Sequence, residues 1–346
     1  MKKLNRTVFI TAPEVMSVDK NFLVVTLEDK EIARESFRNI EAICYYGYAP
    51  VRATLMDACA RHGTRLYIHH PDGQLISSIT SPTYDNSFIR RKQYQAAMNP
   101  AMCLEISKSI ILAKVFNSRW FLGLMSRTYE KQLDIKLIMY TIESLKLCLG
   151  EVMVVRDMDA LQEIRKTAKT ELHAAFDHLI VKNKDLFSFN GRSTKQPTDR
   201  INALLTFAYG LLEELCTSAL EAAGLDPHMG FFHTENPHRA ALTFDLMEEF
   251  RACMADKFVF TVINQGLISS DAFEEVAEGD FAITNNGAEI LSEQWLKLNR
   301  KTTDHTPLAE KIEWGMAPHV SALLLAQFLA GEIDTYPAFT RHKQPH

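Results

Sequence analysis

The strongest constraint on the fold of this chain is a change in hydrophobic periodicity about a quarter of the way along it. Residues 4–79 contain short runs rich in Val, Ile, Thr, Phe and Tyr, and polar turn sequences separate most of them. From residue 87 onward, apolar residues recur at spacings of three and four over long stretches, which is typical of helices. The pattern predicts an α+β protein with two domains.

The predicted domains are a β-rich domain over 1–80, a polar, proline-containing linker over 81–86 and a helical domain over 87–346. Strands are expected over 7–11, 22–27, 40–44, 65–69 and 74–79, with one helix over 49–61. Helices of the second domain are expected over 88–98, 101–116, 129–149, 158–181, 199–223, 240–253, 258–265, 288–301 and 308–331. A β-hairpin is expected over 277–284, with Gly279 near its turn.

Composition favours a globular cytoplasmic protein. The chain has 346 residues, of which 47% are hydrophobic and 23% charged. No apolar run is long enough to predict a membrane span, and no signal peptide is expected. The six cysteines do not form CxxC or CxxH pairs, so we expect them to be reduced and mostly buried rather than ligands of zinc.

Charge is distributed unevenly along the chain. The formal net charge is −5, but residues 86–200 carry a net charge of +7 and residues 201–346 a net charge of −12. A basic middle suits contacts with phosphates, and an acidic end suits metal ligands or contacts with a partner. Chance clustering on solvated helices is the alternative.

The most informative stretch, residues 224–251, reads GLDPHMGFFHTENPHRAALTFDLMEEFR. Gly224 is expected to end a helix, and Gly230 to let the backbone fold closely before His233. The helix that follows places Asp245 and Glu248 on one face. A histidine beside carboxylates suits a divalent cation, whereas the alternative is a core or capping histidine beside a solvated acidic face.

The string GLDP-x-x-GF-x-H, followed by a short polar loop and LxxDLMEEFR, resembles the CRISPR-associated adaptation integrases, a family of metal-dependent DNA endonucleases. In that family this string closes the active site. The resemblance implies that His233 binds a metal ion, that Glu248 supplies a carboxylate, and that Asp245 is a neighbouring acid.

A third ligand also follows from the resemblance. The corresponding helix of the family reads E-G-x-A-A, and its Glu binds the metal; here Glu171 precedes Leu172, His173 and an Ala-Ala pair. The resemblance therefore implies that Glu171, His233 and Glu248 are the catalytic residues and hold Mg²⁺ or Mn²⁺. Two carboxylates and one imidazole suit such a cation. On the residues alone, Glu171 is better explained as a surface acid.

The family also places basic and polar side chains of the helical domain against DNA, where phosphate contacts provide affinity. Solvated helix faces or satisfied buried groups are the alternative for each of these residues. The candidates for DNA contact are Arg90, Arg91, Lys114, Arg119, Arg200, Asn202, Tyr209 and Arg239.

The resemblance implies a function and partners. In the family, short foreign DNA duplexes are inserted into a CRISPR repeat by transesterification with their 3′-hydroxyl ends, and homodimers are bridged by a small ferredoxin-like partner. The β-rich domain mediates dimerisation and partner contact. Residues 336–339 (YPAF) resemble the compact type I branch, close to type I-C. Two alternatives stay open: a non-catalytic DNA-binding scaffold, and a general repair nuclease for branched DNA.

Overall fold

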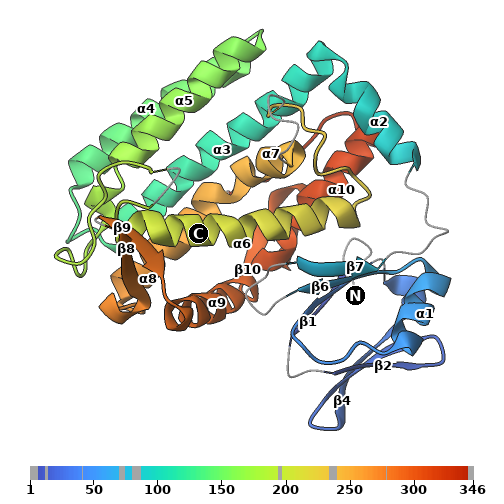
Figure 1. The fold of residues 1–346 in the computed structure, drawn as a ribbon. Coiled ribbons are helices and arrows are strands. Elements are labelled where there is room, and N and C mark those ends of the chain that lie inside the picture. Colours follow the sequence, from blue (N-terminus) through green and yellow to red (C-terminus); the bar gives the residue numbers. More distant parts are fainter. Residues whose placement is uncertain are drawn as a thin grey trace.

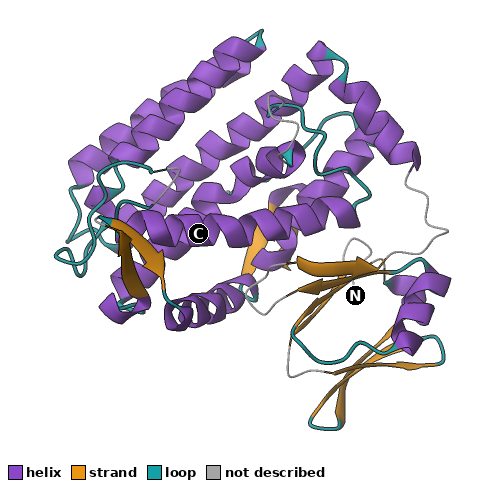
Figure 2. Cartoon of the chain, viewed as in Figure 1, coloured by secondary structure: helices purple, strands orange, loops and turns teal. Residues whose placement is uncertain are grey.

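The computed structural model describes residues 7–11, 15–40, 42–69, 75–79, 87–193, 197–233, 240–277 and 279–341. A small β-rich part precedes a larger helical part (Figures 1 and 2), which confirms the predicted α+β class. The buried apolar side chains form two clusters, one within residues 10–66 and the other within residues 103–339. The predicted linker, 81–86, lies outside the described residues, so the domain boundaries stay predictions.

The N-terminal part contains a four-stranded sheet in the order β1 (Thr7–Thr11), β5 (Ala42–Tyr46), β6 (Arg65–His69) and β7 (Leu75–Ile79). The first three strands are parallel, and β7 is antiparallel to β6. Because parallel neighbours need a crossover connection, helix α1 (Ala53–His62) joins β5 to β6. Gly63 ends α1 in the left-handed conformation.

A second sheet is an antiparallel meander of β2 (Val15–Asp19), β3 (Phe22–Leu27) and β4 (Lys30–Ser36). The turns expected after Asp19 and Glu28 are present, but β2 and β4 were not predicted as strands. Strand β4 is mostly exposed and charged, so it lacks the apolar alternation that identifies a strand in a sequence. The short 3₁₀ helix η1 (Phe37–Asn39) follows it.

The C-terminal part is built from helices and short 3₁₀ and π segments. The longer helices are α2 (Ser87–Ala97), α3 (Pro100–Thr128), α4 (Ile135–Val154), α5 (Met158–Ala174), α6 (Arg200–Ala222), α7 (Ala241–Phe250), α8 (Lys257–Gln265), α9 (Asn285–Asn299) and α10 (Ala317–Ala330). The short segments are η2 (Asp177–Leu179), η3 (Arg251–Asp256, a π-helix), η4 (Ser270–Ala272), η5 (Thr306–Leu308) and η6 (Trp314–Met316).

Two small hairpins accompany these helices. The first pairs β8 (Phe273–Ala277) with β9 (Asp280–Ile283) and has Gly279 at a φ of 81°, which confirms the predicted hairpin. The second pairs β10 (Thr302–His305) with β11 (Glu310–Glu313). It lies partly where the helix predicted over 308–331 was expected to start. The sequence did not indicate this hairpin because strands of four residues are too short to show a clear alternation of apolar and polar residues.

Helix α6 is the central helix of this part. Asp199 caps its N-terminus by accepting the backbone N–H of Asn202 at 2.6 Å. The helix is long and apolar enough by composition to cross a membrane, but 61% of its apolar window is buried inside the protein. It packs against α7, η3 and α10, so we interpret it as a core helix (Figure 1).

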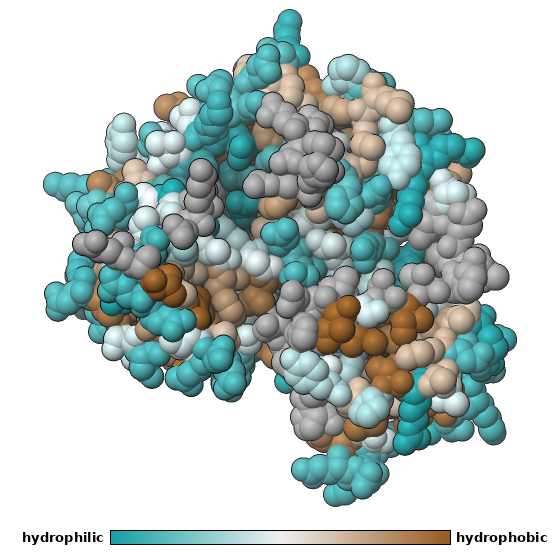
Figure 3. Space-filling view, in the orientation of Figure 1, coloured by the Kyte–Doolittle hydropathy of each residue, from teal (hydrophilic) through white to brown (hydrophobic). Residues whose placement is uncertain are grey.

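The described cysteines agree with the predicted reduced state. Cys59, Cys103, Cys148, Cys216 and Cys253 are free and buried. In the view of Figure 3, apolar areas lie on the β-rich part and at the lower left of the helical part, and the rest of the visible surface is largely hydrophilic. Ile76, on strand β7 of the β-rich part, is 45% exposed.

Candidate functional site

A tightly fixed loop leads from α6 into α7. Gly224 follows α6 with a φ of 83°, and the side chain of Gln93 on α2 donates to the carbonyl oxygens of Asp226 (2.8 Å) and Met229 (2.7 Å). A Cβ atom on Gly230 would lie 2.9 Å from Ala241 and from the carboxylate of Asp245. Only glycine therefore allows this loop to pass so close to α7, as the sequence indicated.

The carboxylate of Asp245 organises the end of this loop. Its Oδ2 accepts the backbone N–H groups of Phe231 (2.7 Å) and Phe232 (3.0 Å). Its Oδ1 accepts the backbone N–H of His233 at 2.9 Å and lies 2.8 Å from Nδ1 of the same residue. Asp245 is completely buried, so it orients the imidazole and leaves Nε2 of His233 facing Oε1 of Glu248 at 3.9 Å.

Glu248 is the charged centre of the site. Its side chain is 1% exposed, its Oε2 pairs with the ammonium group of Lys114, and its Oε1 lies 3.4 Å from Nη1 of Arg165. Burial alone raises the pKa of such a carboxyl group, but the neighbouring cations, led by Lys114 and Arg251, hold the pKa of Glu248 well below its usual range. Glu248 is therefore ionised and already paired with two cations.

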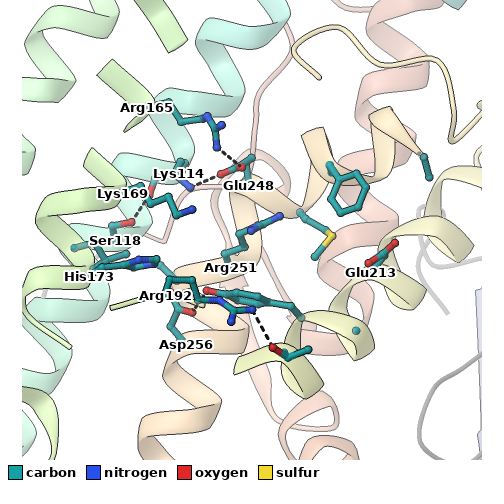
Figure 4. Close-up of a pocket in the computed structure, with 18 of the residues that line it drawn as sticks. Lys114, Ser118, Arg165, Lys169, His173, Arg192, Glu213, Glu248, Arg251 and Asp256 are labelled. Carbon is teal, nitrogen blue, oxygen red and sulfur yellow. Dashed lines mark hydrogen bonds and ion pairs between the residues drawn. The ribbon is translucent and has the colours of Figure 1, made fainter. Parts of the chain in front are cut away.

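These groups line a cavity of about 730 Å³ between α3, α5, α6, α7 and η3. Figure 4 shows Lys114 and Arg165 pointing at Glu248 from two different helices. The cavity is lined by five cationic side chains and three acidic ones. The cations are Lys114, Arg165, Lys169, Arg192 and Arg251, and the acids are Glu213, Glu248 and Asp256.

Aromatic and neutral groups complete the far side of this cavity. The hydroxyl of Tyr209 donates to Oδ1 of Asp256 at 2.7 Å, and burial raises the pKa of Asp256 to about 6. The guanidinium groups of Arg192 and Arg251 lie 5.5 and 5.0 Å from the centre of the Tyr209 ring. Burial, followed by the charge of Lys169, lowers the pKa of His173 to about 3, so this histidine is neutral.

The structure does not bring Glu171 into the site. Residues 165, 169, 172 and 173 of α5 line the cavity, whereas Glu171 does not. Glu171 lies toward Cys148 of α4, where its charge adds to burial and Glu151 in raising the thiol pKa. Two residues along a helix correspond to about 200° of rotation, so Glu171 and Lys169 cannot share a face. The start of this helix was predicted correctly, but it ends at Ala174 rather than at residue 181, and its inward face was predicted wrongly.

The described residues do not fit Mg²⁺ or Mn²⁺. Among them, no group of three or more His, Cys, Asp or Glu side chains is arranged to hold a metal ion. The carboxylate of Asp245 is already occupied by backbone N–H groups and by Nδ1 of His233. The groups left to bind a metal ion are Nε2 of His233 and the carboxylate of Glu248, which Lys114 and Arg165 already neutralise. A hard divalent cation takes six or more ligands, most of them oxygens, and would meet two positive charges here.

The residues predicted to contact DNA have different environments. Lys114 and Tyr209 line the cavity, and Arg90 and Arg91 are exposed on α2. Arg119 donates to the carbonyl of Ile142 at 3.2 Å, so it joins α3 to α4.

Arg200 and Asn202 mainly have local partners. Arg200 donates to the Leu186 carbonyl at 3.3 Å and lies over the ring of Phe281. Asn202 is buried and bonds to Asp199 and the backbone of Gly191 and Ser193. It holds the 191–193 segment in place and leaves no surface for DNA. The remaining candidate, Arg239, lies outside the described residues.

Sequence reasoning missed Arg165, Lys169, Arg192 and Arg251 as site residues. Signals were available for three of them, but not for Arg192. Arg251 follows Glu248 by three residues, and Arg165 and Lys169 are four apart, so each pair lies on one helical face. The tertiary arrangement that makes the two faces meet was not visible in the sequence.

The sequence matches one family of known proteins along most of its length. Residues 8–297 match the family described as CRISPR associated protein Cas1. The chain is 28% identical to "CRISPR-associated endonuclease Cas1 1" of Chlorobaculum tepidum over 98% of this chain and 99% of that protein. It is 31% identical to "CRISPR-associated endonuclease Cas1 2" of Rhodospirillum rubrum, over 97% and 98% of the two chains.

Solved structures show the same fold at lower identity. A casposase bound to its integration product superposes with a TM-score of 0.75 at 21% identity, covering 98% of this chain and 99% of the other. A chain of a partial Cas6-RT-Cas1–Cas2 complex superposes with a TM-score of 0.79 at 18% identity, covering 97% and 99%. At these identities the likeness concerns the fold alone.

Proposed function

Because this chain belongs to the CRISPR associated protein Cas1 family, we propose that it takes part in DNA integration during CRISPR adaptation. In that process short foreign DNA duplexes are inserted into a CRISPR repeat. The observation that carries the proposal is the cavity around Glu248, where five cationic side chains converge in the fold of this family. Lysine and arginine bind DNA phosphates without reading sequence, which suits a protein that handles foreign DNA of any sequence.

Two roles within this process are compatible with the family. The first is a nuclease and integrase that joins the 3′-hydroxyl of the incoming duplex to the repeat, and the names of the relatives support it. Such a transesterification needs positioning and stabilisation of the charge that develops on the phosphate. The second is a DNA-binding subunit that does not itself perform the chemistry.

The contact between Arg165 and Glu248 favours the second role for this chain. The family chemistry implied by the sequence requires a divalent cation held by three side chains, and the described residues assemble no such set. The cations of the pocket remain available to bind phosphate. We therefore conclude that the protein is a DNA-binding subunit of a CRISPR adaptation complex.

Partners follow from the same proposal. The known complexes of related fold include one that joins Cas1 with Cas2. We propose that this protein forms a homodimer through its β-rich part and binds double-stranded DNA together with a small ferredoxin-like partner in the cytoplasm. The exposed Ile76 on β7 suits burial in such an interface.

A strand-transfer experiment tests the proposal. The full-length protein and its small partner are mixed with a labelled DNA duplex and a plasmid carrying the CRISPR repeat, in Mg²⁺ or Mn²⁺. We expect both DNAs to be bound but not joined. Absence of DNA binding in every buffer would refute the proposal.

The same experiment separates the other candidates. Joined product that is lost in His233→Ala and Glu248→Gln would establish the integrase role. Nicking of branched DNA without any need for the repeat or the partner would indicate a repair nuclease instead.

A further inference from the structure

The cavity around Glu248 has more positive than negative charge. Its five cationic side chains come from α3, α5, the 191–193 segment and η3, whereas only three acids line it. One of those acids, Glu248, is already paired with Lys114 and Arg165. The cations therefore face one another across the cavity with too few carboxylates to compensate them.

Unused donors point to the same conclusion. Among the described residues, Lys169 makes no hydrogen bond or ion pair, although it lines the cavity. The Nε atoms of Arg165 and Arg251 are buried and have no hydrogen-bond partner. The Nε atoms of Arg200 and Arg341, outside the cavity, are also unpaired among the described residues, so the unpaired donors show only that Arg165 and Arg251 have hydrogen-bonding capacity left for an anion in the cavity.

Mutual repulsion within the cavity supports this interpretation. Burial lowers the pKa of the Lys169 ammonium group, and the charges of Lys114 and Arg251 lower that pKa further. The low pKa of His173 follows burial and the same cluster of cations. A bound anion would raise both pKa values, because it would stabilise the charged forms of Lys169 and His173.

We propose that this cavity seats a phosphate group of a DNA strand by cationic side chains alone, with Arg165 in the place where a metal-ligating carboxylate was expected. The inference rests on the proposed function in DNA binding and adds that no divalent ion takes part. Arginine suits this task because its planar fork donates two hydrogen bonds to a phosphate. Arg165 and Lys169, four residues apart on α5, present their charges on one face.

Binding of a labelled DNA duplex that carries the CRISPR repeat tests this proposal. The full-length protein is titrated by fluorescence anisotropy in EDTA and in Mn²⁺, at several salt concentrations. We expect the wild-type affinity to agree within about twofold between EDTA and Mn²⁺, because the phosphate contacts are made by side chains. Arg165→Gln and Lys169→Gln should each weaken binding by about five- to tenfold and reduce the salt slope by about one.

Lys166→Gln is the matched control on the same helix. Lys166 is 61% exposed and pairs with Glu163 at 2.6 Å, and it does not line the cavity. This variant removes the same charge and should change the affinity by less than about twofold. Thermal unfolding of all three variants verifies that each is folded.

Two results would overturn the inference while leaving the proposed function intact. One is DNA binding that is lost in EDTA and restored by Mn²⁺. The other is equal binding by Arg165→Gln, Lys169→Gln and Lys166→Gln. Failure of the wild type to bind DNA under any condition would instead refute the proposed function together with this inference.

Discussion

Glu248 and Glu249 are neighbours on α7 and are almost completely buried, yet their surroundings differ. Glu248 pairs directly with the charged ends of Lys114 and Arg165 in the wall of the cavity, and its pKa lies well below the usual range. Glu249 faces neutral donors: the hydroxyl of Tyr336 at 2.5 Å, the N–H of Phe339 at 2.7 Å and the hydroxyl of Ser321. Burial raises the pKa of Glu249 to about 7.

This difference separates the face of α7 that lines the cavity from a face that holds the fold together. Consecutive helix positions point about 100° apart, so adjacent carboxylates enter different environments. Glu248 belongs to a cavity whose cations exceed its acids, whereas Glu249 fixes the segment after α10 onto the helical core. Four experiments test whether the two faces of α7 differ in this way.

The largest expected effect is on stability at Glu249. Glu249→Ala should lower the free energy of unfolding by about 3 kcal/mol or more, because three buried donors lose their acceptor. Urea denaturation measures the change. The control is Glu332→Ala, which alters an exposed acid near the end of α10 and should change the stability by less than about 0.5 kcal/mol. Equal stability of the two variants would show that Glu249 has no structural role.

The second prediction concerns the effect of Glu248 on DNA affinity. Loss of a metal ligand would weaken DNA binding, whereas a cationic phosphate site predicts tighter binding. Glu248→Gln removes a negative charge from the cavity and should tighten DNA binding by about fivefold at low salt. Glu249→Gln, at the adjacent position, should leave the affinity unchanged. Anisotropy titrations in EDTA provide the measurement, and weaker binding by Glu248→Gln would contradict a cationic phosphate site.

A smaller effect is expected in the pH dependence of stability. The folded-state pKa of Glu249, about 7, lies above its ordinary value of 4.5, so the folded protein binds this proton more tightly than the unfolded chain. The contribution of Glu249 to stability is therefore fully present below pH 4.5 and falls as the pH rises through 7. Between pH 4.5 and pH 7, the midpoint temperature of thermal unfolding should fall with rising pH more steeply in the wild type than in Glu249→Gln. Parallel curves would contradict the assignment.

Local features of the site were predictable from the sequence. The close approach at Gly230, the Asp199 cap and the convergence of His233 with Asp245 and Glu248 all depend on contacts within about one loop and one helix. Glycine, capping residues and helical spacing report such contacts directly. The predicted binding of a metal ion by these residues could not be judged from local spacing, because it also required a carboxylate from another helix.

Non-local features were not predictable in the same way. The pair Ala174-Ala175 suggested where α5 packs, but it did not determine which residues face α7, and Glu171 was chosen instead of Arg165. The bond between Tyr336 and Glu249 joins residues 87 positions apart, so no sequence spacing reveals it. Strand β4, which is exposed and charged, was missed because it forms through pairing with β3 rather than through burial.

Whether the cavity around Glu248 binds a divalent cation is tested most simply by titrating the wild-type protein with Mn²⁺ and following the electron paramagnetic resonance signal of the free ion. Arg165→Glu and His233→Ala are measured alongside it. We expect no stoichiometric Mn²⁺ binding by the wild type, and a gain of binding in Arg165→Glu, where a second carboxylate joins Glu248 and Nε2 of His233. One tightly bound Mn²⁺ per wild-type chain, lost in His233→Ala, would contradict this expectation.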